Sequence, residues 1–252
     1  MATNRRSSAS PGEPNRNRVG HGLSEGRRAM VKSADVYVDD ILKHVDTERS
    51  RFTNRPVYLV GHSMGGLLVV MAAQRRPDDF AGLVLVAPLL GIDKELDTCF
   101  RRTLARVVGF LLPAFPVGSL DQKLLSRDPE AIRRFENDPL RYHGSVCAGW
   151  VAAIIPALET AVEQANRMEL PLLIQHGTAD KVCDPEASKV FFDKATSKDK
   201  TMKTYPEAYH DLLCDLEDVR RQVLKDIVDW FATRLSSERA PPPVEGDTSV
   251  QR

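Results

Sequence analysis

Short apolar runs alternate with amphipathic stretches through most of the chain. Continuous apolar runs occupy residues 56–60 (PVYLV), 83–87 (LVLVA) and 172–175 (LLIQ), and a shorter run occupies 202–205. Runs of this length, followed by glycine or proline, are typical of strands buried on both faces of a parallel sheet. The pattern therefore predicts four strands, the last of them short.

Helical periodicity fills the stretches between the predicted strands. Helices are expected at residues 31–49, 64–75, 185–196 and 216–235. The last helix has apolar side chains four residues apart, which gives it one face to bury. These side chains are Val219, Val223, Ile227 and Phe231. Strands that alternate with helices predict an α/β fold with a mostly parallel sheet.

The stretch from about 90 to 168 interrupts this alternation. It is mostly helical in pattern and lies between two predicted core strands, as a cap inserted into a strand-helix fold would. Residues 1–18 and 237–252 contain almost nothing apolar, so we expect both to be disordered tails. One domain is therefore predicted over residues 19–236.

Composition excludes several classes of protein. The 252 residues contain 35 Lys and Arg against 35 Asp and Glu, without the basic stripe that binds nucleic acid. No apolar run is long enough to span a bilayer, and the first residues lack the hydrophobic core of a signal peptide. The four cysteines are widely spaced without a CxxC pair, which favours reduced thiols over disulfides or a zinc site. We therefore expect a cytoplasmic protein without a metal.

The sequence Gly61-His62-Ser63-Met64-Gly65 matches the G-x-S-x-G nucleophile elbow of serine hydrolases. A strand is predicted directly before it and a helix directly after it, as the elbow requires. Its glycines remove side chains that would clash in the tight turn, and the backbone N–H of Met64 is left to bind an oxyanion. The alternative is an ordinary glycine-rich turn between strand and helix. We take Ser63 as the candidate nucleophile.

A serine hydroxyl needs a histidine base, and the histidine needs an acid to orient it. In this fold the acid and then the histidine follow the serine, each after a later strand. Asp180 follows the third predicted strand and is the candidate acid. Its rival Asp184 precedes Pro185, where it is better placed to cap a helix.

His210 lies between the last predicted strand and the last helix, where the base belongs. The other histidines considered are weaker candidates. His176 stands at a strand end, where a packed side chain is expected, and His62 lies inside the elbow. His143 falls in the predicted cap, and His44 falls on the polar side of a helix. His210 is therefore the candidate base.

Several motifs together resemble the monoglyceride lipases, serine hydrolases that cleave monoacylglycerols. The motifs are GHSMGG at 61–66, HGTADKVCD at 176–184, YPEAYHDL at 205–212, VGHGLSEG at 19–26 and NDPL at 137–140. The resemblance implies an α/β-hydrolase fold with a helical cap over an acyl-chain tunnel. It also implies Ser63, Asp180 and His210 as the triad, and no cofactor.

The chain also departs from that family's pattern. In the family, three or four core strands precede the VGHG segment, and a following loop carries an HG motif whose backbone N–H forms half of the oxyanion hole. Residues 1–18 stand in that place here. We therefore expect a shortened form without the N-terminal strands. Because losing one oxyanion donor costs about 10²–10³ in turnover, reduced or absent activity is predicted.

Residues 97–112 carry an apolar helical stripe with three arginines largely off that face. Such a stripe either lies in a membrane interface or packs as a cap helix over the active site. The stripe consists of Phe100, Leu104, Val107, Val108 and Leu111. The resemblance favours the interface, since the family draws a lipid substrate from membranes. Peripheral membrane association through the cap is therefore expected.

The resemblance to this family implies that the acyl chain of the substrate contacts Leu89, Leu104 and Cys183. A small buried residue is the alternative interpretation of Cys183. The expected substrate is a monoacylglycerol. A lysophospholipase or a general carboxylesterase is the alternative enzyme, since the elbow is shared across the fold. A non-catalytic shortened form is the third interpretation, and the oligomeric state stays open.

Overall fold

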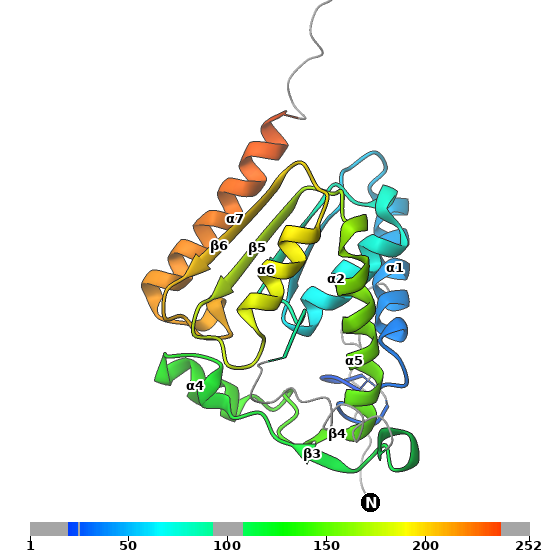
Figure 1. The fold of residues 1–252 in the computed structure, drawn as a ribbon, viewed down its shortest axis with the longest axis vertical. Helices are drawn as coiled ribbons and strands as arrows, with labels where there is room; N and C mark the ends of the chain where they lie inside the picture. Colours follow the sequence, from blue (N-terminus) through cyan, green and yellow to red (C-terminus); the bar gives the residue numbers. More distant parts are fainter. Residues whose placement is uncertain (1–19, 25, 93–107, 238–252) are drawn as a thin grey trace, which may run out of the picture.

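The computed structural model describes residues 20–24, 26–92 and 108–237 (Figure 1). Within these ranges, four strands form one parallel sheet in the order β1-β2-β5-β6. The strands are β1 Tyr58–His62, β2 Gly82–Val86, β5 Leu172–Gly177 and β6 Lys200–Tyr205. The predicted α/β fold with a parallel sheet is therefore confirmed.

Helices cover both faces of this sheet. One layer consists of α1, α2, α5 and α6, and α7 lies on the opposite face (Figure 1). Two parallel strands need a crossover connection, and α2 joins β1 to β2 as α6 joins β5 to β6, while α7 follows the last strand. The bounds are α1 Ala34–Arg51, α2 Met64–Arg75, α5 Ala148–Glu163, α6 Pro185–Lys194 and α7 Glu217–Ser237.

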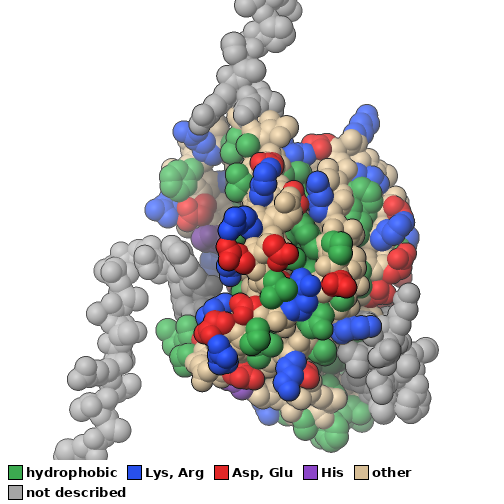
Figure 2. Space-filling view, turned by 90° about the vertical axis from the view of Figure 1, so that its left-hand side faces the viewer, with side chains coloured by type: hydrophobic (Ala, Val, Ile, Leu, Met, Phe, Trp, Pro, Cys, Tyr) green, Lys and Arg blue, Asp and Glu red, His purple; other side chains and the backbone are tan. Residues whose placement is uncertain are grey.

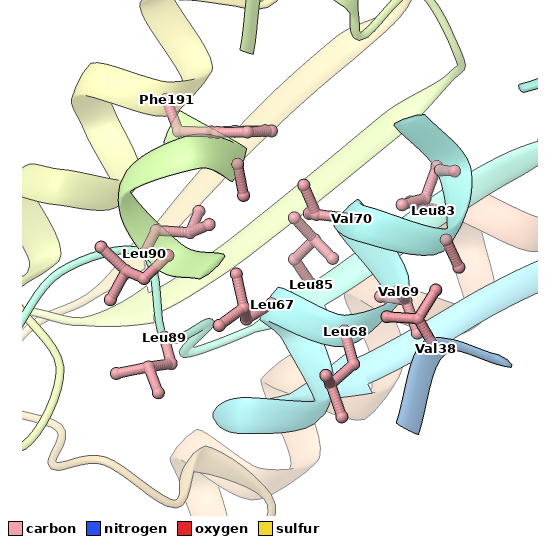
Figure 3. Packing of buried hydrophobic residues seen from close by; sticks show 14 of the residues in the cluster. Val38, Leu67, Leu68, Val69, Val70, Leu83, Leu85, Leu89, Leu90 and Phe191 are labelled. Atoms are coloured by element: carbon pink, nitrogen blue, oxygen red, sulfur yellow. The ribbon is translucent and has the colours of Figure 1, made fainter. Parts of the chain in front are cut away.

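The strand β2 is buried along its whole length, because helices cover it on both sides. Leu83 and Leu85 belong to the core cluster of the α2 layer, and Figure 3 shows them beneath the apolar side chains of that helix. Val84 and Val86 belong to the cluster on the α7 side. Successive side chains of a strand point to opposite faces, so a strand covered twice is an unbroken apolar run.

The predicted strands and helices are confirmed with small shifts at their ends. The predicted strand 56–60 lies at Tyr58–His62, because His62 still pairs with Val86 of β2. The predicted tails, 1–18 and 237–252, lie outside the described residues except for Ser237. Their disorder stays a prediction.

The segment between β2 and β5 contains smaller elements that lie beyond the carboxyl ends of the strands (Figure 1). Two short strands pair antiparallel there, and α4 lies between them in sequence. In contrast, α5 runs beside α2 and buries Ile154 and Leu158 in the core. The predicted cap, about 90–168, thus includes a helix that packs into the main layer.

The remaining bounds complete the fold. The short strands are β3 Pro116–Gly118 and β4 Val146–Cys147, and α4 spans Pro129–Asn137. The 3-10 helices are η1 Pro77–Asp79, η2 Gln122–Leu124, η3 Gln164–Arg167 and η4 Leu212–Cys214. η4 lies between β6 and α7 and follows the loop that carries His210.

Candidate active site

Ser63 lies between the end of β1 and the start of α2. Its backbone adopts φ 53° and ψ −123°, a conformation that is strained for a residue with a side chain. A Cβ on Gly61 would lie 2.5 Å from the carbonyl oxygen of Gly65, and a Cβ on Gly66 would lie 2.6 Å from Pro88 Cβ. A Cβ on Gly65 would meet nothing within 4 Å. The expectation of a clash is thus right for Gly61 and wrong for Gly65.

Three side chains from three loops form one chain of hydrogen bonds. Ser63 follows β1, Asp180 follows β5 and His210 follows β6. Ser63 Oγ lies 2.9 Å from His210 Nε2, and His210 Nδ1 lies 2.8 Å from Asp180 Oδ2. These loops meet because the carboxyl ends of parallel strands lie at one edge of the sheet. The structure therefore brings together the serine, acid and histidine chosen from the sequence.

The hydrogen-bond partners of His210 assign the positions of its protons. An ionised carboxylate only accepts hydrogen bonds, so His210 Nδ1 carries the proton donated to Asp180. In the neutral ring, Nε2 then accepts a hydrogen bond from the hydroxyl of Ser63. This tautomer is the one that can remove the serine proton.

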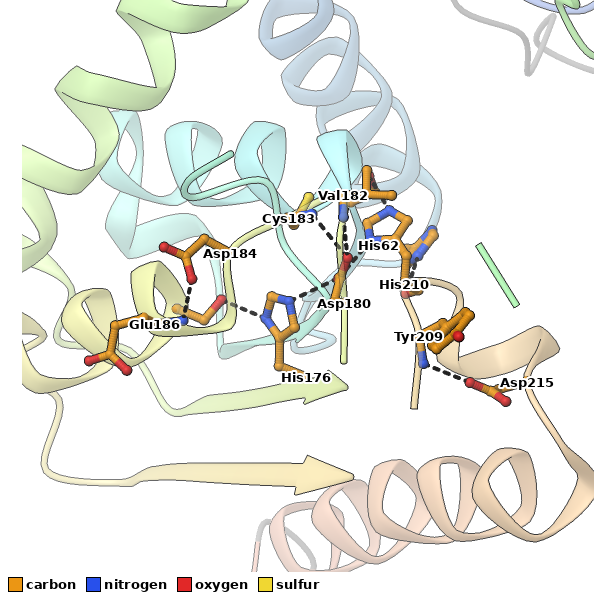
Figure 4. A network of polar contacts seen from close by, with 12 residues as sticks. His62, His176, Asp180, Val182, Cys183, Asp184, Glu186, Tyr209, His210 and Asp215 are labelled. Carbon is orange, nitrogen blue, oxygen red and sulfur yellow. Dashed lines mark hydrogen bonds and ion pairs between the residues drawn. The ribbon is translucent and has the colours of Figure 1, made fainter. Parts of the chain in front are cut away.

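The carboxylate of Asp180 is buried but well supplied with donors (Figure 4). Its Oδ1 accepts the backbone N–H groups of Val182 at 2.7 Å and Cys183 at 3.0 Å. Burial raises the pKa of Asp180, but the hydrogen bonds from His176 and His210 oppose this effect. Together with the other favourable contacts they outweigh it, so the net pKa lies well below its ordinary value. Asp180 is therefore ionised at neutral pH.

His62 and Cys183 are titratable side chains that lie beside the three residues. The ring of His62 lies 5.1 Å from that of His210, centroid to centroid. Burial, and then the neighbouring His210, lower the pKa of His62. Burial raises the pKa of the Cys183 thiol well above its ordinary value, although a hydrogen bond with Ser63 lowers it in part. Both side chains are therefore uncharged at neutral pH.

The remaining candidate residues surround Ser63 where they are described. Leu89 is buried and donates its N–H to the carbonyl oxygen of Ser63 at 2.9 Å, and Cys183 is also buried. Met64 is the first residue of α2, so its N–H belongs to the helix terminus, where amides lack intrahelical acceptors and anions are favoured. Leu104 lies outside the described residues.

The rival residues have other structural roles. Oδ1 of Asp184 accepts the N–H of Glu186 at 2.9 Å, so Asp184 is the N-cap of α6 as expected. His44 is exposed on α1. His143 is exposed, and its Nε2 lies 2.9 Å from the carbonyl oxygen of Asp138. None of the three contributes to the hydrogen-bond chain of Ser63.

Sequence reasoning missed the role of His176. It was expected only to pack at a strand end, and it is indeed fully buried. However, its Nε2 lies 3.0 Å from Asp180 Oδ2, the oxygen that also accepts from His210. The strand-end position of His176 indicated burial, and a buried histidine needs a hydrogen-bond partner, but the sequence does not say which residue that partner is.

A second missed feature holds the loop that carries His210. The carboxylate of Asp215 is fully buried and accepts the N–H of Tyr209 at 2.9 Å. Its other oxygen accepts from Arg127 Nε at 2.9 Å. Nearby, the N–H of Asp211 donates to the carbonyl oxygen of Leu125 at 2.7 Å. The loop before α7 is thereby tied to the segment before α4.

A cavity of about 500 Å³ lies between α5 and α6, beside this site. Its apolar lining includes Leu90, Ile92 and Leu158. Four carboxylate residues also line it: Glu159, Glu163, Asp184 and Glu186. None of Ser63, Asp180 and His210 lines this cavity.

Over residues 20–24, 26–92 and 108–237, no group of three or more His, Cys, Asp or Glu side chains could hold a metal ion. No helix in these same ranges has the length and apolar character needed to cross a bilayer.

A serine, a histidine and a carboxylate joined in this order at the edge of a parallel sheet define a serine hydrolase of the α/β-hydrolase fold. A family model described as "Serine aminopeptidase, S33" matches residues 17–217. The chain is 36% identical over 228 residues to the monoglyceride lipase of Homo sapiens, covering 89% of this chain and 75% of the relative. It belongs to the monoglyceride lipase family of serine hydrolases.

Two further comparisons agree with that assignment. The monoglyceride lipase of Rattus norvegicus is 35% identical over 218 residues, covering 86% of this chain and 72% of the relative. The crystal structure of the monoacylglycerol lipase of Paleococcus ferrophilus superposes with a TM-score of 0.76 at 32% identity. That match covers 85% of this chain and 80% of the solved chain.

Proposed function

We propose that this protein hydrolyses monoacylglycerols to a fatty acid and glycerol, with Ser63 as nucleophile, His210 as base and Asp180 as acid. The observation that carries the proposal is the unbroken hydrogen-bond chain from Ser63 Oγ through His210 to Asp180, at 2.9 and 2.8 Å. Membership of the monoglyceride lipase family supports the substrate class. The triad chemistry proposed here requires no metal or cofactor.

The first half of the reaction forms an acyl-enzyme. Ser63 Oγ attacks the ester carbonyl carbon while His210 Nε2 takes the hydroxyl proton. Asp180 holds the opposite side of the ring and stabilises the imidazolium that results. The carbonyl oxygen becomes an oxyanion, and the N–H of Met64 at the terminus of α2 donates to it. The tetrahedral intermediate then expels the glycerol alkoxide, which takes the proton from His210.

The second half of the reaction restores the enzyme. His210, again neutral, removes a proton from water, and the resulting hydroxide attacks the acyl carbon on Ser63. The second tetrahedral intermediate breaks at the Ser63 ester bond, and the serine oxygen recovers its proton from His210. The acid leaves as a carboxylate once its proton passes to solvent. Water is consumed and one ester bond is broken in each cycle.

The residues next to Ser63 support an apolar substrate. Leu89 and Cys183 are buried against the elbow, and the thiol of Cys183 is uncharged. We propose that they contact the acyl chain near the ester. A lysophospholipase or general carboxylesterase uses the same triad, so the alternatives differ in the leaving group that the site accepts.

Substrate profiling tests this assignment. Glycerol release from 1-monooleoylglycerol is expected to exceed hydrolysis of lysophosphatidylcholine and of p-nitrophenyl butyrate in kcat/KM. Ser63→Ala is expected to remove all three activities. Higher kcat/KM for the phospholipid, or for the short ester, would favour the corresponding alternative enzyme.

We also propose that the protein is cytoplasmic and reaches its substrate by peripheral contact with a membrane. Five exposed apolar side chains support this docking surface, here called the apolar patch. They are Phe110, Leu111, Leu112, Phe115 and Val117. Figure 2 shows hydrophobic side chains gathered at the end of the molecule where β3 and β4 lie. Large exposed apolar patches of this kind mark interaction sites, including membranes.

Vesicle flotation tests the apolar patch. Phe110 is 86% exposed, and Phe110→Asp is expected to reduce co-flotation with phosphatidylcholine vesicles. The matched control is Val228→Asp on α7, where the side chain is 62% exposed outside the apolar patch. Equal flotation of the two variants and the parent protein would overturn the docking surface without affecting the triad.

A further inference from the structure

His176 is a buried histidine outside the Ser63, His210 and Asp180 chain, yet it contacts the acid of that chain directly. It lies near the carboxyl end of β5, and its side chain is fully buried. Its Nε2 lies 3.0 Å from Asp180 Oδ2, and its Nδ1 lies 2.8 Å from Ser188 Oγ on α6. Figure 4 shows the ring directed at Asp180. Both ring nitrogens therefore have a protein partner.

These partners assign the tautomer of the His176 ring. The ionised carboxylate of Asp180 only accepts, so His176 Nε2 must carry the proton that it donates. In the neutral ring, Nδ1 is then an acceptor, and the hydroxyl of Ser188 donates to it. Ser188 is itself fully buried, so this donor is held in place by the packing of α6. The α6 layer thus fixes the direction in which His176 donates.

The two carboxylate oxygens of Asp180 accept hydrogen bonds from different kinds of donor. Oδ2 accepts from both His176 and His210, at 3.0 and 2.8 Å. Oδ1 accepts the backbone N–H groups of Val182 and Cys183. The loop amides alone hold one oxygen, so His176 is the side chain that fixes the rotation of the oxygen facing His210. It also takes up part of the negative charge that would otherwise act on His210 alone.

We propose that His176 is a positioning residue that orients the Asp180 carboxylate and moderates its attraction for His210. This inference rests on the proposed function, because the proposed function assigns His210 as the base. Without the second donor, the Asp180 carboxylate would stabilise the imidazolium of His210 more strongly. The proton would then be held more tightly on His210, and only the two loop amides on Oδ1 would keep the carboxylate in its productive orientation.

Three other titratable groups lie near His176, Asp180 and His210, and none of them would explain a changed pH profile in a variant at position 176. His62 approaches from the end of β1, and burial and His210 keep its pKa low. Cys183 follows β5, and burial keeps its pKa high. Asp211, which follows His210, carries a charge that acts on His62. A replacement at position 176 leaves these three groups in place, so a changed pH profile reports on Asp180 and His210.

The test compares His176→Leu, which removes the donor at similar volume, with His176→Gln, which keeps an N–H near the Nε2 position. His176→Leu is expected to lower kcat for p-nitrophenyl butyrate by about tenfold, with little change in KM. The acid limb of its kcat/KM profile is expected to move to higher pH by about half a unit or more. His176→Gln is expected to restore most of both properties.

Gln175→Leu is the matched control, since Gln175 is adjacent, equally buried and also loses hydrogen bonds. Its side chain contacts Tyr205 and the carbonyl oxygen of Val223, on the α7 side of the sheet. It is expected to lower thermal stability without moving the pH profile. A His176→Leu profile that coincides with that of the parent, with kcat reduced only by the fraction unfolded, would overturn the proposal.

A spectroscopic measurement separates this inference from the proposed function. The pKa of His210 is followed by NMR of the folded protein labelled with ¹⁵N-histidine, which requires no turnover. It is expected to rise in His176→Leu and to return towards the parent value in His176→Gln. An unchanged pKa would refute the role of His176 even in an active enzyme. A raised pKa in a protein without esterase activity would support that role while the proposed function fails.

Discussion

Arg127 donates from Nε to the buried carboxylate of Asp215 at a distance of 2.9 Å. The second oxygen of that carboxylate accepts the N–H of Tyr209, the residue before His210. The side chain of Arg127 is 20% exposed and that of Asp215 is fully buried. One buried ion pair therefore holds the histidine loop against a segment more than eighty residues earlier in the chain.

Removing the cation from this pair is expected to be costly. Arg127→Ala leaves Asp215 as a buried charge without its partner, and the free energy of unfolding is expected to fall by about 3–5 kcal/mol. Urea denaturation measures this loss. Arg133→Ala, which breaks an exposed pair with Glu130, is the control and is expected to change stability very little. Similar losses in the two variants would contradict the role given to Asp215.

The two glycines of the elbow are expected to respond differently to alanine. Gly61→Ala places a Cβ 2.5 Å from the backbone oxygen of Gly65, so the free energy of unfolding is expected to fall by about 1–3 kcal/mol. Gly65→Ala meets open space on a helix, where alanine is favoured by about 0.5–1 kcal/mol. Thermal melting of both variants checks the contrast. A larger loss in Gly65→Ala would show that the turn is packed differently.

The backbone of Ser63 is expected to store strain. Its φ of 53° and ψ of −123° suit glycine, and such conformations cost other residues about 1–3 kcal/mol. Ser63→Gly is therefore expected to be more stable than Ser63→Ala by about 1 kcal/mol or more. Both variants lack the hydroxyl, so the difference between their denaturant midpoints reports the cost of the backbone conformation at position 63. Equal midpoints, or a more stable alanine variant, would argue against strain at the nucleophile.

Asp180, the proposed acid of the triad, is expected to make stability depend on pH. Asp180 has a folded-state pKa well below its ordinary value of 3.8. Its charged form therefore stabilises the fold above that pH, and the contribution is lost as pH falls towards the folded pKa. Asp180→Asn is expected to be less stable than the parent near neutral pH, with a difference that narrows below pH 3.8. Urea denaturation at each pH measures this difference in the free energy of unfolding. A difference that stays the same at every pH would refute the lowered pKa of Asp180.

The core elements were predictable because their apolar patterns are strong. β2 is an unbroken apolar run, since layers on both faces bury it, and α2 begins directly after Ser63. The arrangement of Ser63, Asp180 and His210 was predictable because their order in the chain follows the order of the strands. The N-cap role of Asp184 was also predictable from the local sequence, because Asp184 directly precedes Pro185 at the start of a helix.

Other features depend on contacts that no local pattern encodes. The bond between His176 and Asp180 requires the loop after β5 to turn back on its own strand. The pair of Arg127 and Asp215 joins segments that are distant in sequence. The length of β1 depended on pairing with β2, because Gly61 still lies in the ladder although glycine is rare in strands. Tertiary packing decided each of these.

Covalent labelling by a fluorophosphonate probe tests the central claim most directly. The probe phosphonylates an activated serine and releases fluoride, so it reports the nucleophile without any assumption about the substrate. Peptide mass spectrometry is expected to find the label on Ser63, with no label in Ser63→Ala and much less in His210→Ala. A folded protein that leaves Ser63 unlabelled, or that carries the label on another serine, would contradict the account.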